Sequence, residues 1–254
     1  MPAYVGTSGW QYRHWRGVFY PRPARGLDEL ALYAARYASV ELNGSFYRLP
    51  EASTFAGWAA RTPADFVFAV RASRYLTHVR RLRDPAEPVR RLMDRAGRLS
   101  AKLGPVLLQL PPTLHADAGL LRDVLRAFNH AARVAVECRH ESWFTDETRR
   151  VLEQEDAALC LADRGSRWLT PMWRTANWGY VRFHWGSGEP ESCYTTPALE
   201  ARAHEIARLW PGEDLYVYFN NDPHACALRD ASLFAAFLER DGIDCARTPA
   251  AIAV

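Results

Sequence analysis

The chain has 254 residues, of which 48% are hydrophobic and 24% charged, a composition that excludes a disordered chain and is typical of a folded protein with a large core. Its formal net charge of +3 is too small to indicate a nucleic-acid partner by itself. No apolar run is long enough to cross a bilayer, and the first residues lead into strand-like sequence without a signal peptide. We therefore expect a cytoplasmic protein with no membrane partner.

Short β-branched and aromatic runs alternate with amphipathic helical stretches along the whole chain. There are eight such runs, and each interval between them can hold a helix and two loops. The sequence therefore predicts an α/β fold, a single (β/α)8 TIM-like barrel over residues 1–254. The expected strands are residues 4–7, 39–42, 66–70, 106–109, 134–137, 158–162, 180–184 and 215–220.

Apolar stripes at helical spacing occupy most of the intervals. The stripe from Val89 to Leu103 predicts a helix that ends at Gly104. Residues 164–178, which follow the sixth strand, are rich in Trp and Arg but have no clean periodicity. We expect an irregular or short helix there, or a loop in its place.

The cysteines are five in number, widely spaced and without a C-x-x-C pair. This pattern argues against a disulfide framework and against a zinc site, so we expect all of them to be reduced packing residues. They are Cys138, Cys160, Cys193, Cys226 and Cys245.

The segment 134–143, which reads VAVECRHESW, begins as an apolar strand and ends in charged residues. Alternation along the strand places Glu137 and Arg139 on one face. Because the active site of such a barrel lies at the carboxyl ends of its strands, polar residues at the other strand ends should lie beside this pair. The residues expected at the mouth are Glu41, Asn43, Arg71, Gln109, Glu137, Arg139, Asp163, Arg182, His184, Tyr218 and Asn220.

Motifs spread over almost the whole chain carry a resemblance to a known family. They are GTSGWQY at 6–12, VELNGSFY at 40–47, FAVRASRYLTH at 68–78, LLQLPP at 107–112, VECRHESW at 136–143, YVRFH at 180–184 and YFNN at 218–221. Together they resemble the domain-of-unknown-function 72 (DUF72) family, the YecE-like proteins. The resemblance implies a TIM-like barrel, related in architecture to barrels such as endonuclease IV, and it implies no established reaction.

Two positions depart from the pattern of that family. Arg71 stands where the family usually has lysine, and Trp185 follows His184 where glycine is common. The only lysine, Lys102, precedes a predicted strand and so lies at the wrong end of the barrel for catalysis. A Schiff-base mechanism is therefore excluded.

The expected mouth combines carboxylates, a histidine and arginines. Glu137 is the expected general acid or base, with Glu41, His184 and Asp163 as further catalytic candidates. The alternative for Glu137 is an internal salt bridge with Arg139. Three arginines in one mouth repel one another unless an anion neutralises them, which predicts an anion clamp. The clamp residues are Arg71, Arg139 and Arg182.

A divalent metal held by Asp163, Glu137, Glu41 and His184 is a weaker alternative, because the chain lacks the dense ligand spacing of a dedicated metal site. We therefore expect no cofactor. Loop aromatics either stack a sugar or base of the ligand or roof the barrel. They are Trp10, Tyr12, Trp15, Phe46, Tyr47, Tyr75 and Trp143.

Three functions remain open. The first is an enzyme, a hydrolase or lyase, that acts by acid/base chemistry on an anionic, phosphate-bearing substrate at the mouth. The second is a nucleic-acid-binding or processing protein, suggested by the loop aromatics and the arginine excess, in which the run from Arg80 to Arg98 contacts phosphates or forms a solvated helix face. The third is a non-catalytic ligand-binding barrel.

Overall fold

Eight parallel strands close into a barrel in the order β1 to β8, with β1 hydrogen-bonded to β8. The structure, a computed structural model, describes residues 2–22, 28–250 and 252. The predicted α/β TIM-like barrel is confirmed. The strands are β1 (Ala3–Ser8), β2 (Ser39–Leu42), β3 (Val67–Arg71), β4 (Leu103–Gln109), β5 (Val134–Glu137), β6 (Ala158–Asp163), β7 (Gly179–Phe183) and β8 (Leu215–Phe219).

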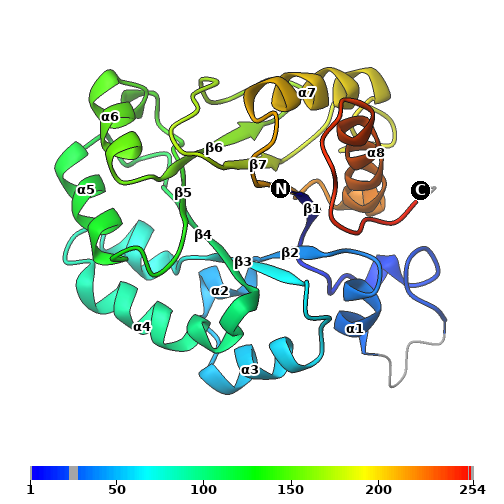
Figure 1. Ribbon diagram of the computed structural model, residues 1–254, viewed down its shortest axis with the longest axis horizontal. Helices are drawn as coiled ribbons and strands as arrows, with labels where there is room; N and C mark the ends of the chain where they lie inside the picture. Colours follow the sequence, from blue (N-terminus) through cyan, green and yellow to red (C-terminus); the bar gives the residue numbers. More distant parts are fainter. Residues whose placement is uncertain (1, 23–27, 251, 253–254) are drawn as a thin grey trace.

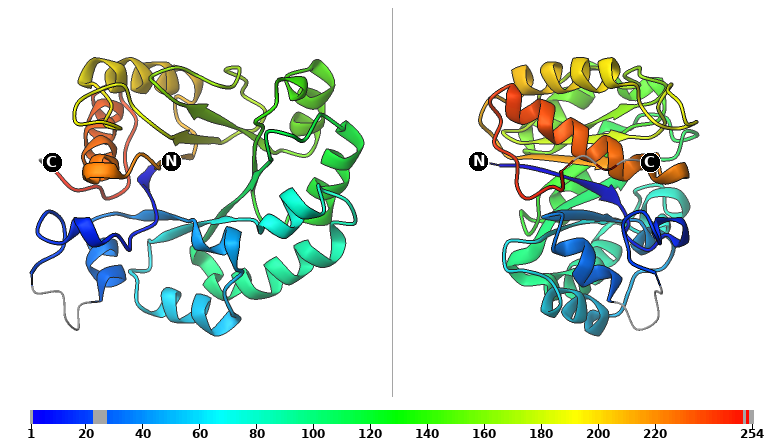
Figure 2. Two further views of the ribbon diagram at one scale, coloured as in Figure 1. Left: turned by 180° about the vertical axis from the view of Figure 1, so that it is seen from behind. Right: turned by 90° about the vertical axis from the view of Figure 1, so that its right-hand side faces the viewer.

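Helices surround the strands (Figure 1), and α8 lies alongside β1 where the barrel closes (Figure 2). None of the helices in the described part of the chain is long and apolar enough to cross a membrane. The α-helices are α1 (Glu29–Ala34), α2 (Gly44–Tyr47), α3 (Ala52–Ala60), α4 (Ala86–Ala96), α5 (Ala118–Ala127), α6 (Asp146–Gln154), α7 (Thr196–Leu209) and α8 (Cys226–Arg240). Short helical turns are η1 (Arg13–Trp15), η2 (Tyr75–Val79), η3 (Gly97–Lys102), η4 (Glu141–Trp143) and η5 (Pro223–Ala225).

The segment between β6 and β7, residues 164–178, contains no helix, which confirms the loop alternative. In place of a helix, the Trp168 side chain covers this part of the barrel. Its ring lies 6.1 Å from that of Phe183, and its Nε1 donates a hydrogen bond of 2.7 Å to Glu205 of α7. The loop is thereby tied to the helix layer and still leaves other residues free to face the mouth.

The prediction that a helix ends at Gly104 is wrong. The helix α4 ends at Ala96, and the chain continues as the turn η3, in which Ser100 has a φ of 54°. Gly104 lies inside β4, where an added Cβ would come 2.5 Å from Cγ1 of Val67. The glycine is therefore needed for a close approach of two strands and not for a helix cap.

Strand side chains alternate between the barrel interior and the helix layer, except at the irregularity where β3 pairs with the start of β4. On β5, Val134 and Val136 pack in the outer core, whereas Ala135 and Glu137 face inward. Below the charged residues, the interior is filled by small and aromatic side chains, so the barrel is a packed core and not a pore. These inner residues are Ala69, Leu107, Ala135, Ala158, Cys160, Trp178, Tyr180, Tyr216 and Tyr218.

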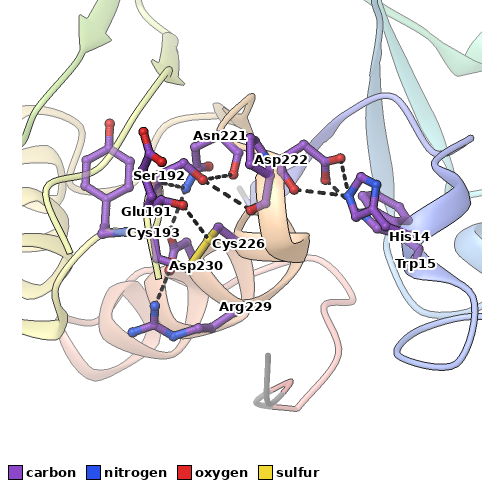
Figure 3. Close-up of a disulfide and its surroundings, with 12 residues drawn as sticks. His14, Trp15, Glu191, Ser192, Cys193, Asn221, Asp222, Cys226, Arg229 and Asp230 are labelled. Atoms are coloured by element: carbon purple, nitrogen blue, oxygen red, sulfur yellow. Dashed lines mark hydrogen bonds and ion pairs between the residues drawn. A yellow bond between two sulfur atoms is a disulfide. The ribbon is translucent and has the colours of Figure 1, made fainter. Parts of the chain in front are cut away.

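Cys193 and Cys226 form a disulfide (Figure 3), which corrects the expectation that all five cysteines are reduced. The bond links the segment that follows β7 to the first residue of α8. The two cysteines are 33 positions apart, so no local motif in the sequence signals the pairing. Cys138, Cys160 and Cys245 are free thiols.

A buried carboxylate lies beside the disulfide. Asp230 of α8 accepts hydrogen bonds of 2.8 Å from the backbone N–H of Tyr194 and 2.7 Å from Nδ2 of Asn221. Asn221 also donates to the backbone oxygen of Ser192 at 2.9 Å (Figure 3). These bonds, together with the disulfide, fix the segment after β7 to the start of α8.

Reduction of the disulfide should destabilise the fold. A cross-link that closes a loop of 33 residues stabilises by about 3–4 kcal/mol in the chain-entropy model. We expect the double variant Cys193→Ser/Cys226→Ser to lose about that much free energy of unfolding in urea titrations under oxidising conditions. Cys245→Ser is the matched control, and equal stability of the double variant and the control would contradict the prediction.

The buried Asp230 should make stability depend on pH. Burial raises its pKa to about 6 in the folded state, so the folded protein binds this proton more tightly than the unfolded chain and loses stability as the pH rises from about 4 to about 6. Asp230→Asn removes this loss. Relative to the wild type, the variant should gain about 3 kcal/mol between pH 4 and pH 7, measured by urea unfolding. The exposed Asp123→Asn on α5 is the control, and a pH-independent difference for Asp230→Asn would refute the prediction.

Candidate functional site

A buried arginine joins two glutamates inside the barrel. Arg182 of β7 donates from Nη2 to Oε1 of Glu41 at 2.8 Å and from Nη1 to Oε2 of Glu137 at 2.5 Å. All three side chains are at most 1% exposed. The contact connects β2, β5 and β7 at their carboxyl ends.

Glu41 is fully occupied by hydrogen bonds. Ser8 Oγ donates to its Oε1 at 2.7 Å, and the hydroxyl of Tyr180 donates to its Oε2 at 2.7 Å. Burial alone would raise the pKa of Glu41, but the positive charges of Arg182 and Arg71 and these hydrogen bonds lower the pKa below its ordinary value. Glu41 is therefore a fixed carboxylate that balances the arginines.

Glu137 has three cationic or protonated neighbours. Besides Arg182, its Oε1 accepts from Arg139 Nε at 2.9 Å and lies 3.1 Å from His184 Nε2. Burial would raise the pKa of Glu137, but Arg182, His184 and Arg139 together hold it well below its ordinary value. A carboxylate so strongly stabilised in its charged form is a weak base and a poor proton donor at neutral pH.

The contacts of His184 indicate which ring nitrogen carries the proton. Because Nε2 faces the Glu137 carboxylate, the neutral ring places its proton there, and Nδ1 is left as the acceptor. Nδ1 lies 3.4 Å from Nδ2 of Asn220, which follows β8. In this tautomer Nδ1, beside Asn220, is the ring nitrogen that carries a lone pair.

Arg71 is also held inside the protein. It donates to Oδ1 of Asn43 at 3.0 Å and to Oε1 of Gln109 at 2.6 Å, and its guanidinium stacks 4.0 Å from the ring centroid of Phe46. Gln109 accepts a second bond from Arg182 at 3.2 Å. Arg71 and Arg182 are thus committed to internal partners.

The charged cluster at the mouth of the barrel carries excess positive charge. Three arginines and two glutamates leave one net positive charge when His184 is neutral, and protonation of His184 adds another. A site of this kind attracts anions. The members of the cluster are Glu41, Arg71, Glu137, Arg139, Arg182 and His184.

A cavity of about 680 Å³ opens above this cluster, over the carboxyl ends of β4 to β8. Glu137 and His184 form its floor. Its volume lies within the range of small-molecule sites. The lining residues are Pro112, Glu137, Cys138, Arg139, Glu141, Phe144, Ala162, Arg164, Leu169, His184, Trp185 and Asn220.

Two guanidinium groups line this cavity with donors to spare, and two carboxylates, Glu137 and Glu141, line it as well. Arg139 uses Nε for Glu137, and within the described residues its terminal nitrogens have no further protein partner. Arg164, exposed at the start of the β6–β7 loop, makes no side-chain hydrogen bond or ion pair to any described residue. Both groups can bind an anionic ligand.

Asp163 lies on the opposite face of its strand from the cavity, so its expected position at the mouth is wrong. Its Oδ1 accepts from the hydroxyl of Tyr194 at 2.8 Å, and its Oδ2 accepts from Arg202 of α7 at 2.9 Å. Leu159 and Leu161 share this outer face and pack in the outer core. The metal-ligand set that included Asp163 is therefore not assembled.

Most of the loop aromatics roof the barrel. Trp143 is fully buried, and its Nε1 donates to the backbone oxygen of Leu114 at 2.7 Å, so its ring cannot stack a ligand. Trp10 is 6% exposed, and the hydroxyl of Tyr12 donates to the backbone oxygen of Ser8. Two further rings are also buried, those of Trp15 and Phe46.

Tyr218 lies inside the barrel, where its hydroxyl is 2.6 Å from Oγ of Ser39. It lies below the mouth and has no access to the cavity. By contrast, Tyr47 and Tyr75 are 78% and 50% exposed.

Several cavity residues were missed in the sequence. Arg164 directly follows the end of β6, and Trp185 directly follows His184, so reading one residue further at each strand end would have found both. No sequence pattern indicates that Phe144 and Leu169 line the cavity, because their positions depend on how two loops fold over the mouth. Glu141 likewise comes to the rim through the turn η4.

Replacement of Arg182 should destabilise the protein strongly. Arg182→Leu leaves Glu41 and Glu137 buried without a shared cation, so we expect a loss of about 3–5 kcal/mol at pH 7. The triple variant with Glu41→Gln and Glu137→Gln should recover most of this loss. Urea unfolding measures both, with the exposed Arg167→Gln as control, and a loss below about 1 kcal/mol for Arg182→Leu would contradict this account.

Comparison with known proteins agrees with this architecture. The crystal structure of a DUF72 family protein from Thermotoga maritima MSB8 has a TM-score of 0.78 and 27% identity, covering 94% of this chain and 100% of that one. One from Enterococcus faecalis V583 has a TM-score of 0.78 at 17% identity, covering 93% of this chain and 95% of that one, and shows a shared fold.

Sequence comparison identifies the family. The UPF0759 protein YunF of Bacillus subtilis (strain 168) is 29% identical over 152 residues, which are 56% of this chain and 52% of YunF. The match thus spans about half the length of this curated relative. The profile of a family described as "Protein of unknown function DUF72" matches residues 4–252. The chain belongs to the DUF72 family.

Proposed function

We propose that this protein is an enzyme that binds a small phosphate-bearing substrate in the cavity above β4 to β8 and acts on it by acid/base chemistry, as a hydrolase or lyase. The observation that carries the proposal is the pair of guanidinium groups, Arg139 and Arg164, that face a cavity with His184 at its floor. Phosphate oxygens accept hydrogen bonds from guanidinium groups in a matching planar geometry.

The anion clamp is assigned to Arg139 and Arg164. The earlier expectation used Arg71, Arg139 and Arg182, but Arg71 is buried with its terminal nitrogens on Asn43 and Gln109, and Arg182 is buried with its terminal nitrogens on Gln109 and the two glutamates. Their charge still favours an anion nearby. The terminal nitrogens of Arg139 and Arg164 are the groups free to contact it.

Proton transfer is assigned to Nδ1 of His184. Glu137 accepts from Nε2, which fixes the tautomer and stabilises the imidazolium that forms when Nδ1 takes a proton. Glu137 itself, with its pKa held well below the ordinary value, is a positioning residue in this scheme. Asn220, 3.4 Å from Nδ1, orients the ring from the other side.

Nucleic-acid binding is a second candidate, supported by the exposed rings of Tyr47 and Tyr75. The arginine run supports it less. Arg80, Arg90 and Arg95 pair with nearby acids, as in an ordinary solvated helix face. A steep fall in oligonucleotide affinity with salt would favour this candidate.

Binding of inorganic phosphate should depend on the clamp. We expect Arg139→Gln and Arg164→Gln each to weaken phosphate binding about tenfold or more, because each removes a charge-assisted hydrogen bond. Isothermal titration calorimetry measures the change. Arg167→Gln, an exposed arginine of the same loop that does not line the cavity, is the control. Equal affinities in all three variants would refute the clamp.

Turnover should depend on His184. In a panel of phosphate monoesters followed by phosphate release, which hydrolysis and β-elimination both produce, His184→Gln should lower kcat by about a hundredfold or more. Phosphate affinity should change little, because the clamp remains. Full activity in this variant would exclude His184 as the acid or base. If the wild-type protein binds phosphate but turns over none of the esters, the result would support the non-catalytic ligand-binding barrel.

A further inference from the structure

The cavity above the charged cluster has an apolar wall. Phe144, Leu169 and Trp185 line it together with Pro112, while the floor and rim carry the charged groups. Leu169 is 52% exposed although it is a large aliphatic residue. Such apolar surface, in the same cavity as the guanidinium groups of Arg139 and Arg164, is suited to cover the apolar part of a ligand whose anionic part those groups bind.

Backbone hydrogen bonds hold Leu169 and Trp185, and a ring contact holds Phe144. The N–H of Leu169 donates to the oxygen of Ala162 at 2.8 Å, and the oxygen of Trp185 accepts from the N–H of Gly165 at 2.6 Å. Phe144 packs edge-on against Trp173, with ring centroids 6.3 Å apart. The chain that carries the wall is therefore fixed, so a ligand does not have to order this backbone.

The segment behind Trp185 is also fixed. The N–H of Gly186 donates to the oxygen of Ser192 at 2.8 Å, and an added Cβ at Gly186 would come 2.1 Å from the backbone oxygen of Cys193. Cys193 is in turn bonded to Cys226 (Figure 3). The disulfide therefore supports the chain on which Trp185 stands.

The size of the cavity excludes a bare phosphate as its full occupant. A volume of about 680 Å³ accommodates a complete small molecule, and a phosphate held by Arg139 and Arg164 would leave the wall uncovered. Two of the wall residues, Phe144 and Trp185, are aromatic, and such side chains pack most favourably against another planar ring.

From this wall we infer that the natural substrate is a phosphate monoester of an aromatic or similarly apolar ring compound, in which the ring packs between Phe144, Leu169 and Trp185 while the phosphate contacts Arg139 and Arg164. The inference rests on the proposed function and adds the chemical class of the group that carries the phosphate.

Calorimetry with three probes tests it: phenyl phosphate, methyl phosphate and inorganic phosphate. We expect phenyl phosphate to bind at least about tenfold more tightly than methyl phosphate, because its ring removes apolar wall surface from water. Equal affinities of the phenyl and methyl esters would overturn the inference and leave the phosphate site standing. Failure of all three probes to bind would overturn the proposed function itself.

Two variants link the preference to the wall. Trp185→Ala and Leu169→Ser should each weaken phenyl phosphate binding by about fivefold or more and change methyl phosphate binding by less than about twofold. Val79→Ser removes an equally exposed apolar residue from η2, outside the cavity, and should change neither. Leu169 is exposed, so its replacement tests the wall even if Trp185→Ala fails to fold. A phenyl preference that survives in Leu169→Ser overturns the assignment.

Discussion

The shared hydrogen bonding of Arg182 to Glu41 and Glu137 is the contact on which the mouth of this barrel depends. A guanidinium has enough donors to serve two carboxylates and Gln109 at once, and no other side chain present there does so. Removal of these charges from water is costly, and the hydrogen bonds that Ser8 and Tyr180 donate to Glu41 offset part of this cost. The result is a rigid charged layer above an apolar barrel interior.

The contacts within this charged layer separate the polar residues that are held inside the barrel from those that line the cavity. Because Glu137 is stabilised as an anion, it serves to hold His184 and Arg139 in place beside the cavity. Arg71 and Arg182 supply charge from below, whereas Arg139 and Arg164 lie at the surface of the cavity. The strength of the internal contacts thus decides which groups remain free for a ligand.

The alternation of side chains along the strands predicts which polar residues lie inside the barrel. The two-residue period places Glu41, Glu137 and Arg182 inside because their apolar neighbours must face the helices. The same rule, applied to β6, turns Asp163 outward with Leu159 and Leu161. The prediction that Asp163 lies at the mouth is wrong because it took account of the end of the strand but not of the face to which the side chain points. The burial of Trp143 and the pairing of Cys193 with Cys226 depend on contacts between distant segments, which no local pattern records.

The helix-free segment between β6 and β7 has a consequence for evolution and engineering of this barrel. A single stretch, residues 164–178, covers the outside of the barrel through Trp168 and walls the cavity through Leu169. Exchange of the whole loop would therefore uncover the outer face of the barrel and change the cavity at the same time. The shape of the cavity is more readily varied at single positions such as Leu169, because the neighbouring Trp168 continues to cover the strands.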